Sequence, residues 1–240
     1  MSTYHSKKAK EFLKDPKKVE RHDRTFWSLR QKRDAAAAEL PEWEDLREHA
    51  SRIKEHTATH LADYLEQFSN SLERNGVIVH FAKDAQEFNE MVYGILESHK
   101  VKKLVKSKSM LTEECEMNPY LIKRGINVVE SDLGERILQL MHLKPAHIVM
   151  PAIHLTRDEI GEMFEEKGIS KEKGNHDPTY LTRCAREDLR GDFMDADAGL
   201  TGCNFGVAAT GDCVVCTNEG NADMSTSVPK LHIVAMGIEK

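Results

Sequence analysis

The stretch of sequence that decides the fold reads VKKLVKSKSMLTEE and covers residues 101–114. Its first part, residues 101–106, is a short apolar run of the kind that forms a buried β-strand. The residues that follow are hydroxyl-bearing and acidic, and they predict a helix from about Thr112 to Arg124, ended by Gly125. A strand that passes directly into a helix predicts a parallel sheet with helical crossovers.

The same alternation continues on both sides of this stretch. Further strands are predicted at residues 77–81, 126–129, 147–150 and 231–236, with strand-like pieces at residues 207–209 and 213–216. Helix N-caps are predicted at Asp84, Thr156 and Asp177, and a further helix is predicted from Asp132 to His142. Repeated units of this length imply an α/β fold, with three α/β/α layers around a mostly parallel sheet.

Residues 1–75 differ from the rest of the chain. They contain no strand candidate and are predicted to be helical throughout, because apolar residues recur at helical spacing among many charged ones. Asn75-Gly76 is a typical helix stop. We therefore expect a helical N-terminal extension at residues 1–75 and an α/β domain at residues 76–240.

The composition excludes several classes of protein. The 240 residues carry 34 basic and 40 acidic side chains, a net charge of −6, which argues against a general nucleic-acid binder. No run of about 18 apolar residues is present, so no membrane span is expected. The N-terminus lacks the apolar segment of a secretory signal. Five cysteines are an odd number, and reduced thiols in the cytoplasm are the simplest interpretation.

The loop after the 101–106 strand is the first candidate site. Parallel strands place ligands at their carboxyl ends, and a helix N-terminus offers free N–H groups to an anion. Lysine and hydroxyl side chains there could hold a carboxylate or phosphate, and the candidate residues are Lys106, Ser107, Lys108, Ser109 and Glu113. The alternative is that the lysines are solvated and the acidic residues only complement the helix dipole.

A second group of candidates lies nearer the C-terminus. Five of the fourteen glycines fall in residues 199–220. They mark either a set of tight turns or a backbone that brings Asn204, Asn218 and Glu219 toward one cleft. His154 follows a predicted strand and could reach the same cleft.

No metal site is predicted. Cys213 and Cys216 form a C-x-x-C inside a predicted strand, where residues three apart point to opposite faces, so we expect plain buried cysteines. His56 and His60 have the spacing of a helical metal pair, but they lack the glutamate and the third ligand of a zinc site.

Several longer segments carry a resemblance to a known family. They read KSKSM at residues 106–110, ESDLGE at 130–135, PAHIVMPAIH at 145–154, ADAGLTGCNF at 196–205 and TNEGN at 217–221. With these segments, in this order, the sequence resembles the lactate utilisation protein B family, the iron–sulfur component of a bacterial L-lactate oxidation system. The resemblance covers nearly the whole chain.

The resemblance implies a lactate-utilisation (LUD) domain with the broad fold of ribose-5-phosphate isomerases and CoA transferases, behind a helical N-terminal extension. It also implies a part in the oxidation of L-lactate to pyruvate, together with two other lactate-utilisation subunits. In this family the electrons pass through 4Fe-4S clusters.

Two departures from the family pattern limit what it implies. Family members continue into a ferredoxin-like part with C-x-x-C-x-x-C-x-x-x-C-P runs, which this sequence does not contain. We therefore expect a piece of a longer protein, with the clusters outside it and no cofactor within it. Ala209 stands where the family usually has an acidic residue, which argues against a covalent CoA-transferase step through a glutamate.

These observations leave three functional hypotheses. The leading one is the N-terminal domain of an iron–sulfur lactate-oxidising component, not catalytic by itself, whose strand-end loop holds a small carboxylate or other anion. Replacing Lys106 and Lys108 together by alanine should then remove anion binding and leave the fold intact. An isomerase or CoA-ester enzyme on the same fold would need a catalytic carboxylate at the strand ends, and the candidates are Glu113, Glu130 and Glu219. A non-catalytic scaffold would instead use the helical extension to dock partner subunits.

Overall fold

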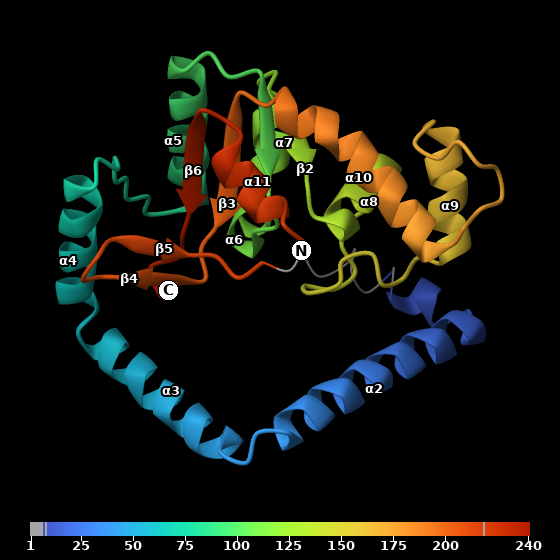
Figure 1. Ribbon diagram of the computed structural model, residues 1–240, viewed down its shortest axis with the longest axis horizontal. Coiled ribbons are helices and arrows are strands. Elements are labelled where there is room, and N and C mark those ends of the chain that lie inside the picture. Colours follow the sequence, from blue (N-terminus) through green and yellow to red (C-terminus); the bar gives the residue numbers. More distant parts are fainter. Residues whose placement is uncertain (1–6, 8, 218) are drawn as a thin grey trace. The chain divides into compact units, whose positions relative to one another are not determined.

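The computed structural model describes residue 7, residues 9–217 and residues 219–240 (Figure 1). The chain divides into two compact units, of which the first ends at His60 and the second covers Leu61–Lys240. The predicted boundary at residue 75 falls after helix α4 (Leu61–Arg74), which the structure groups with the second unit.

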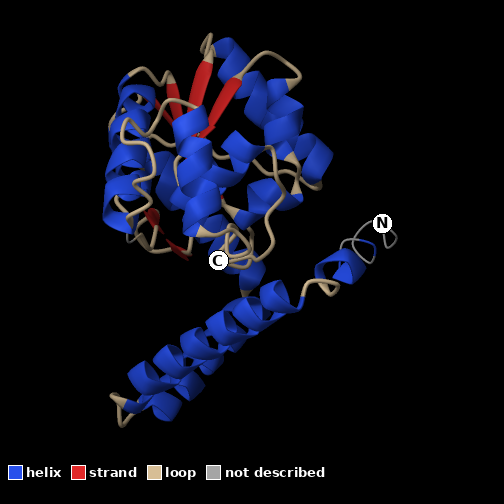
Figure 2. Ribbon diagram, turned by 90° about the vertical axis from the view of Figure 1, so that its right-hand side faces the viewer, coloured by secondary structure: helices blue, strands red, loops and turns tan. Residues whose placement is uncertain are grey.

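The first unit contains two long helices, α2 (Pro16–Ala38) and α3 (Trp43–Thr59), drawn in blue in Figure 2. Asp15 caps α2, since its carboxylate accepts hydrogen bonds from the backbone N–H groups of Lys17 and Lys18. Neither helix contains a buried residue. The helical prediction is thus confirmed for residues 16–38 and 43–59, but these helices enclose no core of their own.

The second unit is built on a parallel sheet of four strands (Figure 1). Their order across the sheet is β2 (Asn127–Glu130), β1 (Lys103–Lys106), β3 (Ala198–Gly202) and β6 (Leu231–Ala235). All three neighbouring pairs are parallel. The carboxyl ends of the strands therefore meet at one edge of the sheet, and the residues that follow them are brought together there.

Helices cover both faces of this sheet, which confirms the predicted three-layer fold. Leu104 of β1 packs in one buried cluster with Leu96 and Leu121, whereas the next residue, Val105, packs in another with Phe193. Besides α4, the helices of this unit are α5 (Ala85–Ser98), α6 (Met110–Glu114), α7 (Met117–Ile122), α8 (Leu133–Met141), α9 (Arg157–Glu166), α10 (Pro178–Met194) and α11 (Asn221–Ser227). Among the described residues, no helix is both long enough and apolar enough to cross a membrane.

A two-stranded antiparallel hairpin follows β3 and packs against α4. It consists of β4 (Phe205–Val207) and β5 (Asp212–Val214). The Ser71 hydroxyl on α4 donates a hydrogen bond of 2.8 Å to the carbonyl oxygen of Ala208 in the turn. The turn also needs Gly211, with φ of +78°, because a Cβ there would lie 2.8 Å from the backbone carbon of Ser71.

Two of the predicted strands do not form. Residues 77–81, all described, are an irregular segment in which Ile78 and Phe81 are 79% and 58% exposed. Residues 147–150 are a loop in which the ring of His147 accepts two backbone hydrogen bonds. A short apolar run becomes a strand only where another strand satisfies its backbone groups, and neither run has such a partner here.

Two further predictions are corrected. The inner strand β3 is not predicted from the sequence, because its Ala-Gly-Leu-Thr-Gly residues carry no obvious strand signal. Its Gly199 is required because a Cβ there would lie 1.8 Å from the carbonyl oxygen of Ser225 in α11. The single helix predicted over residues 112–124 is two short helices, because the backbone turns to a positive φ of 51° at Glu116.

Candidate functional site

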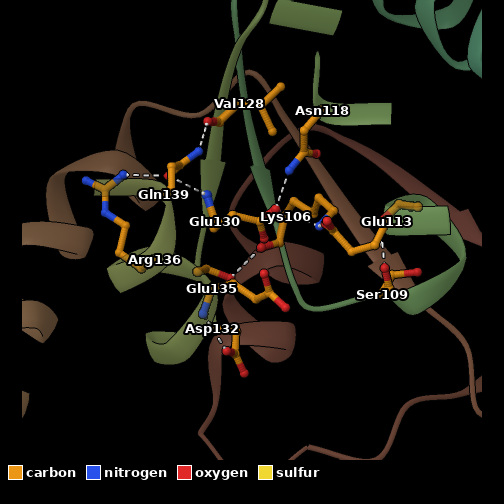
Figure 3. Close-up of polar contacts among 12 residues, drawn as sticks. Lys106, Ser109, Glu113, Asn118, Val128, Glu130, Asp132, Glu135, Arg136 and Gln139 are labelled. Carbon is orange, nitrogen blue, oxygen red and sulfur yellow. Dashed lines mark hydrogen bonds and ion pairs between the residues drawn. The ribbon is translucent and has the colours of Figure 1, made fainter. Parts of the chain in front are cut away.

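The ends of β1 and β2 carry a buried lysine between two carboxylates. Lys106 and Glu130 are the last residues of their strands and lie opposite each other in the sheet. The Lys106 ammonium donates hydrogen bonds to Glu130 Oε1 at 2.7 Å and to Glu113 Oε1 at 3.0 Å (Figure 3). The side chain of Lys106 is completely buried and that of Glu130 is 3% exposed. The charge of Lys106 is therefore matched inside the protein by two carboxylates, one from β2 and one from α6.

Burial and charge act against each other on Lys106. Burial alone would lower the pKa of the ammonium, but the carboxylates of Glu130 and Glu113 raise it above its usual value. Lys106 thus remains a cation. Removing its side chain would leave Glu130 buried without a counter-ion, so Lys108→Ala alone is a cleaner test of anion binding than the double replacement.

Glu130 has one oxygen that is engaged and one that is not. Its Oε1 accepts from Lys106 and from the side-chain amide of Asn118. Its Oε2 is buried and has no hydrogen-bond partner among the described residues. Burial raises the pKa of the Glu130 carboxyl, while Lys106 and Asn118 oppose that change. A buried carboxylate oxygen without a partner among the described residues makes Glu130 a candidate functional residue.

Glu135 brings a third carboxylate to the cluster. It lies in the first turn of α8, where its backbone N–H donates a hydrogen bond of 3.0 Å to the side chain of the N-cap residue Asp132. Burial, followed by the nearby charges of Glu130 and Glu113, raises the pKa of Glu135 to about 7. Three carboxyls thus share the neighbourhood of one ammonium (Figure 3), and Glu135 can hold or release a proton near neutral pH.

Lys108 and Glu219 form a more accessible part of the same edge. The Lys108 ammonium donates a hydrogen bond of 2.8 Å to the carbonyl oxygen of Val149. This bond connects the 142–156 loop to the loop that follows β1. Glu219 accepts a hydrogen bond of 3.4 Å from the backbone N–H of Leu133. Burial and the charge of Asp132 raise the pKa of Glu219, and Lys108 opposes them. The structure therefore places Lys108 and Glu219 close enough to interact.

The remaining predicted residues occupy different places. Ser107 and Ser109 are both buried, and Ser109 occupies the N-cap position of α6 without a side-chain capping bond. Asn204 lies in the hairpin region, where its side-chain oxygen accepts 2.8 Å from the backbone N–H of Cys216. His154 is half-buried in the turn that follows the 147–150 loop. Asn218 lies outside the described residues.

The sequence reading missed part of the cluster. The sequence predicts Glu113 as a ligand residue and Glu130 only as a candidate of the enzyme hypothesis. It does not predict Glu135 or Asn118 as part of the site. One signal was available for Glu135, since an aspartate N-cap followed three residues later by glutamate directly after a strand places that glutamate at the strand ends. No signal pointed to Asn118, because α7 reaches Glu130 only through the folding of the chain.

The residues of this chain do not fit a 4Fe-4S cluster. Such a cluster is held by four thiolates, and the five cysteines are dispersed: Cys184 is buried in α10, and Cys115 ends α6. Within the described parts of the chain, no three metal-ligating side chains come together.

Comparison with known proteins identifies the family of this fold and site. The family model for the LUD domain matches residues 65–240. The chain belongs to the LUD domain family. Lys106, Glu113, Glu130 and Glu135 all fall inside the LUD domain, as do the sheet and the hairpin.

Relatives of known name are similar over most of the chain. Lactate utilization protein B of Bacillus pumilus (strain SAFR-032) is 47% identical over 213 residues, which are 88% of this chain and 45% of the relative. The protein of the same name from Shouchella clausii (strain KSM-K16) is 45% identical over 214 residues, 88% of this chain and 44% of the relative. The chain thus spans less than half the length of these relatives. No solved structure gives a significant match.

Proposed function

We propose that this chain is the LUD-domain part of a lactate utilisation protein and takes part in the oxidation of L-lactate to pyruvate. The observation that carries the proposal is the 47% identity to lactate utilization protein B over 213 residues. In this proposal the electrons pass through 4Fe-4S clusters outside residues 1–240. The protein works in the cytoplasm with two other lactate-utilisation subunits.

The strand-end edge supplies two functions that such a role needs. Lys108 lies outside the buried cluster, where its ammonium donates to the carbonyl oxygen of Val149, and its charge can attract the carboxylate of a small hydroxy acid. Oxidation of a hydroxy acid also releases protons. Glu135, whose pKa is raised to about 7, and Glu130 are the groups of this chain suited to accept one.

A chimeric protein tests the proposal. The matched 213 residues of Bacillus pumilus lactate utilization protein B would be replaced by those of this chain, so that the rest of the relative remains. We expect the chimera to restore growth on L-lactate to a strain that lacks its own copy. A chimera that accumulates to the normal level and gives no growth would contradict the proposal. Growth on glucose is the matched control for general fitness.

A second candidate function is favoured by the unpartnered Oε2 of Glu130 beside Lys106. A carboxylate and an ammonium at the ends of parallel strands suit proton transfer in an isomerase, or in an enzyme that acts on CoA esters. Turnover of a sugar phosphate or a CoA thioester by the isolated chain, lost in Glu130→Gln, would support it. Absence of turnover with both substrate classes leaves the lactate proposal in place.

A further inference from the structure

A side chain from α8 closes the outer edge of strand β2. This strand is the outermost one on its side of the sheet, so part of its backbone faces away from β1. The side-chain nitrogen of Gln139 donates a hydrogen bond of 2.8 Å to the carbonyl oxygen of Val128. The side-chain oxygen of Gln139 accepts one of 3.2 Å from the backbone N–H of Glu130 (Figure 3). One carboxamide thus satisfies these two outward-facing backbone groups.

The Gln139 carboxamide takes the place of a peptide group from a further parallel strand. In a parallel sheet, the N–H and C=O of one residue bond to the two residues on either side of the facing residue in the next strand. The nitrogen and oxygen of Gln139 bond to Val128 and Glu130 in the same way. An edge strand otherwise presents unpaired N–H and C=O groups. Gln139 therefore fixes the backbone at the residue that carries the buried carboxylate.

The orientation of this carboxamide is fixed by an arginine. Arg136 Nη1 donates a hydrogen bond of 3.0 Å to the same oxygen of Gln139. Arg136 Nη2 in turn donates to the carboxylates of Asp188 at 3.0 Å and Asp192 at 3.3 Å, both in α10. A guanidinium donates hydrogen bonds and accepts none. The oxygen of Gln139, and not its nitrogen, must therefore face Arg136 and the N–H of Glu130.

Glu130 is the residue of the candidate site that this support reaches. Its Oε1 accepts the hydrogen bond of 2.7 Å from the buried ammonium of Lys106. A shift of the backbone at Glu130 would move the carboxylate relative to that ammonium. Gln139 and Glu135 lie one turn apart on the same face of α8. One helix therefore supplies one carboxyl of the candidate site and supports the strand that carries another.

We propose that Gln139 is a positioning residue, which holds the Glu130 carboxylate against Lys106 through the backbone of β2. Its contacts are with the backbone of Val128 and Glu130 and with Arg136, so it acts through Glu130 and not on a substrate. The expected effect on growth rests on the proposed function of Glu130. The expected effect on the position of the carboxylate does not.

The test follows Glu130 by NMR in the folded chain. Gln139→Met keeps the length of the side chain but removes its donor and its strong acceptor. We expect the backbone N–H of Glu130 to exchange with solvent about tenfold faster in this variant, and the carboxyl carbon resonance of Glu130 to shift. A glutamine that only stabilises the fold would leave that resonance unchanged. Gln86→Met, which removes a hydrogen bond to Glu90 on the surface of α5, is the matched control and should change neither signal.

A conservative variant tests the role of the side-chain oxygen. Gln139→Glu keeps an acceptor for Arg136 and for the N–H of Glu130, and loses only the donor to Val128. We therefore expect Gln139→Glu to retain the slow exchange of the Glu130 N–H. Exchange in Gln139→Glu that is as fast as in Gln139→Met would contradict the assigned role of the oxygen.

Two results in Gln139→Met would overturn the proposal: an unchanged exchange rate of the Glu130 N–H, or an unchanged carboxyl resonance. If this variant does not fold, the unmodified chain decides. Exchange of the Glu130 N–H as slow as that of Ser131, which donates to Lys106 in β1, supports the proposal. Exchange as fast as that of Lys144 in the exposed loop overturns it.

Growth of the chimeric protein separates this inference from the proposed function. If the Glu130→Gln chimera fails to grow on L-lactate, the Gln139→Met chimera should accumulate normally and grow more slowly than the parent. Equal growth of the Gln139→Met chimera and the parent would then count against a positioning role. If the Glu130→Gln chimera grows normally, the function proposed for Glu130 fails, and the two NMR signals still decide whether Gln139 holds its carboxylate.

Discussion

Helix α3 and the strand-end cluster, which consists of Lys106, Glu113, Glu130 and Glu135, both contain ion pairs, but in opposite surroundings. On α3, Arg52 Nε lies 3.0 Å from Glu48 Oε1, with side chains that are 72% and 62% exposed. At the strand ends, Lys106 Nζ lies 2.7 Å from Glu130 Oε1, with side chains that are 0% and 3% exposed. The distances are nearly equal, so the surroundings decide what each pair does. The solvent-exposed pair contributes little to the free energy of unfolding. In the buried pair, removing one charge leaves the other in the core without a counter-ion, which is strongly destabilising.

The comparison also explains the high charge of the chain. Helices α2 and α3 have no buried residue, and their charged side chains keep them hydrated. The cluster uses only a few charged residues, but it brings them together where β1, β2, α6 and α8 meet. A high density of charged residues in the sequence therefore does not locate a functional site. Charged side chains that are buried in contact with one another do.

The largest effect is expected from Lys106→Met. It leaves Glu130 and Glu113 without their cation, and we expect the free energy of unfolding to fall by about 3–5 kcal/mol. Urea denaturation followed by circular dichroism measures the change. Lys103→Met is the matched control, because its ion pair with Asp192 is 24% and 21% exposed and should contribute less. A loss below about 1 kcal/mol for Lys106→Met would show that the buried pair is not coupled as described.

Glu135 should make the stability depend on pH. The folded protein keeps this proton up to about pH 7, whereas the unfolded chain releases it near 4.5. Between these values the folded state binds more protons, so the free energy of unfolding should fall as the pH rises from 4.5 to 7, by about 1–2 kcal/mol. Glu135→Gln should flatten this slope. An equal slope in both proteins, measured by urea denaturation across the range, would contradict the raised pKa.

Lys108→Ala should separate binding from folding. Its one described hydrogen bond is to the carbonyl of Val149, so the free energy of unfolding should change by only about 1 kcal/mol. If Lys108 attracts the substrate carboxylate, the dissociation constant for L-lactate, measured by calorimetry, should rise about tenfold. Lys144→Ala, in the exposed loop nearby, is the control and should leave L-lactate binding unchanged. If Lys108→Ala binds L-lactate with unchanged affinity, Lys108 does not contribute to the binding site.

The smallest effect is expected from Arg52→Ala on α3. Its ion pair with Glu48 is solvent-exposed, so the free energy of unfolding should change by less than about 0.5 kcal/mol. A double-mutant cycle with Glu48→Ala measures the coupling directly. A coupling free energy as large as that between Lys106 and Glu130 would contradict the difference described between the exposed and the buried ion pair.

The sequence predicted the local features of the fold well. The predicted N-caps Asp84, Thr156 and Asp177 are all N-caps in the structure, because a cap depends only on the residues beside it. Strands depend on partners elsewhere in the chain. The apolar runs at 77–81 and 147–150 therefore failed as strands, and the glycine-containing β3, buried at the centre of the sheet, was missed.

The candidate site was predicted in the same uneven way. The strand-end loop was located correctly at residues 106–109, because a strand followed by a helix defines that position. The depth of Lys106 and its convergence with Glu130 and Glu135 were not predicted, because they follow from the pairing of β1 with β2 and from the start of α8. No periodic pattern in the sequence predicts that β1 pairs with β2.

The most direct measurement compares Glu130→Gln and Glu48→Gln in the chimeric lactate utilisation protein. Both changes remove one carboxylate charge at nearly constant size, one from the buried cluster and one from α3. If the strand-end cluster performs the function, the Glu130→Gln chimera accumulates normally but fails to support growth on L-lactate, while the Glu48→Gln chimera grows like the parent. Equal growth of both chimeras would contradict the assignment of function to the buried cluster.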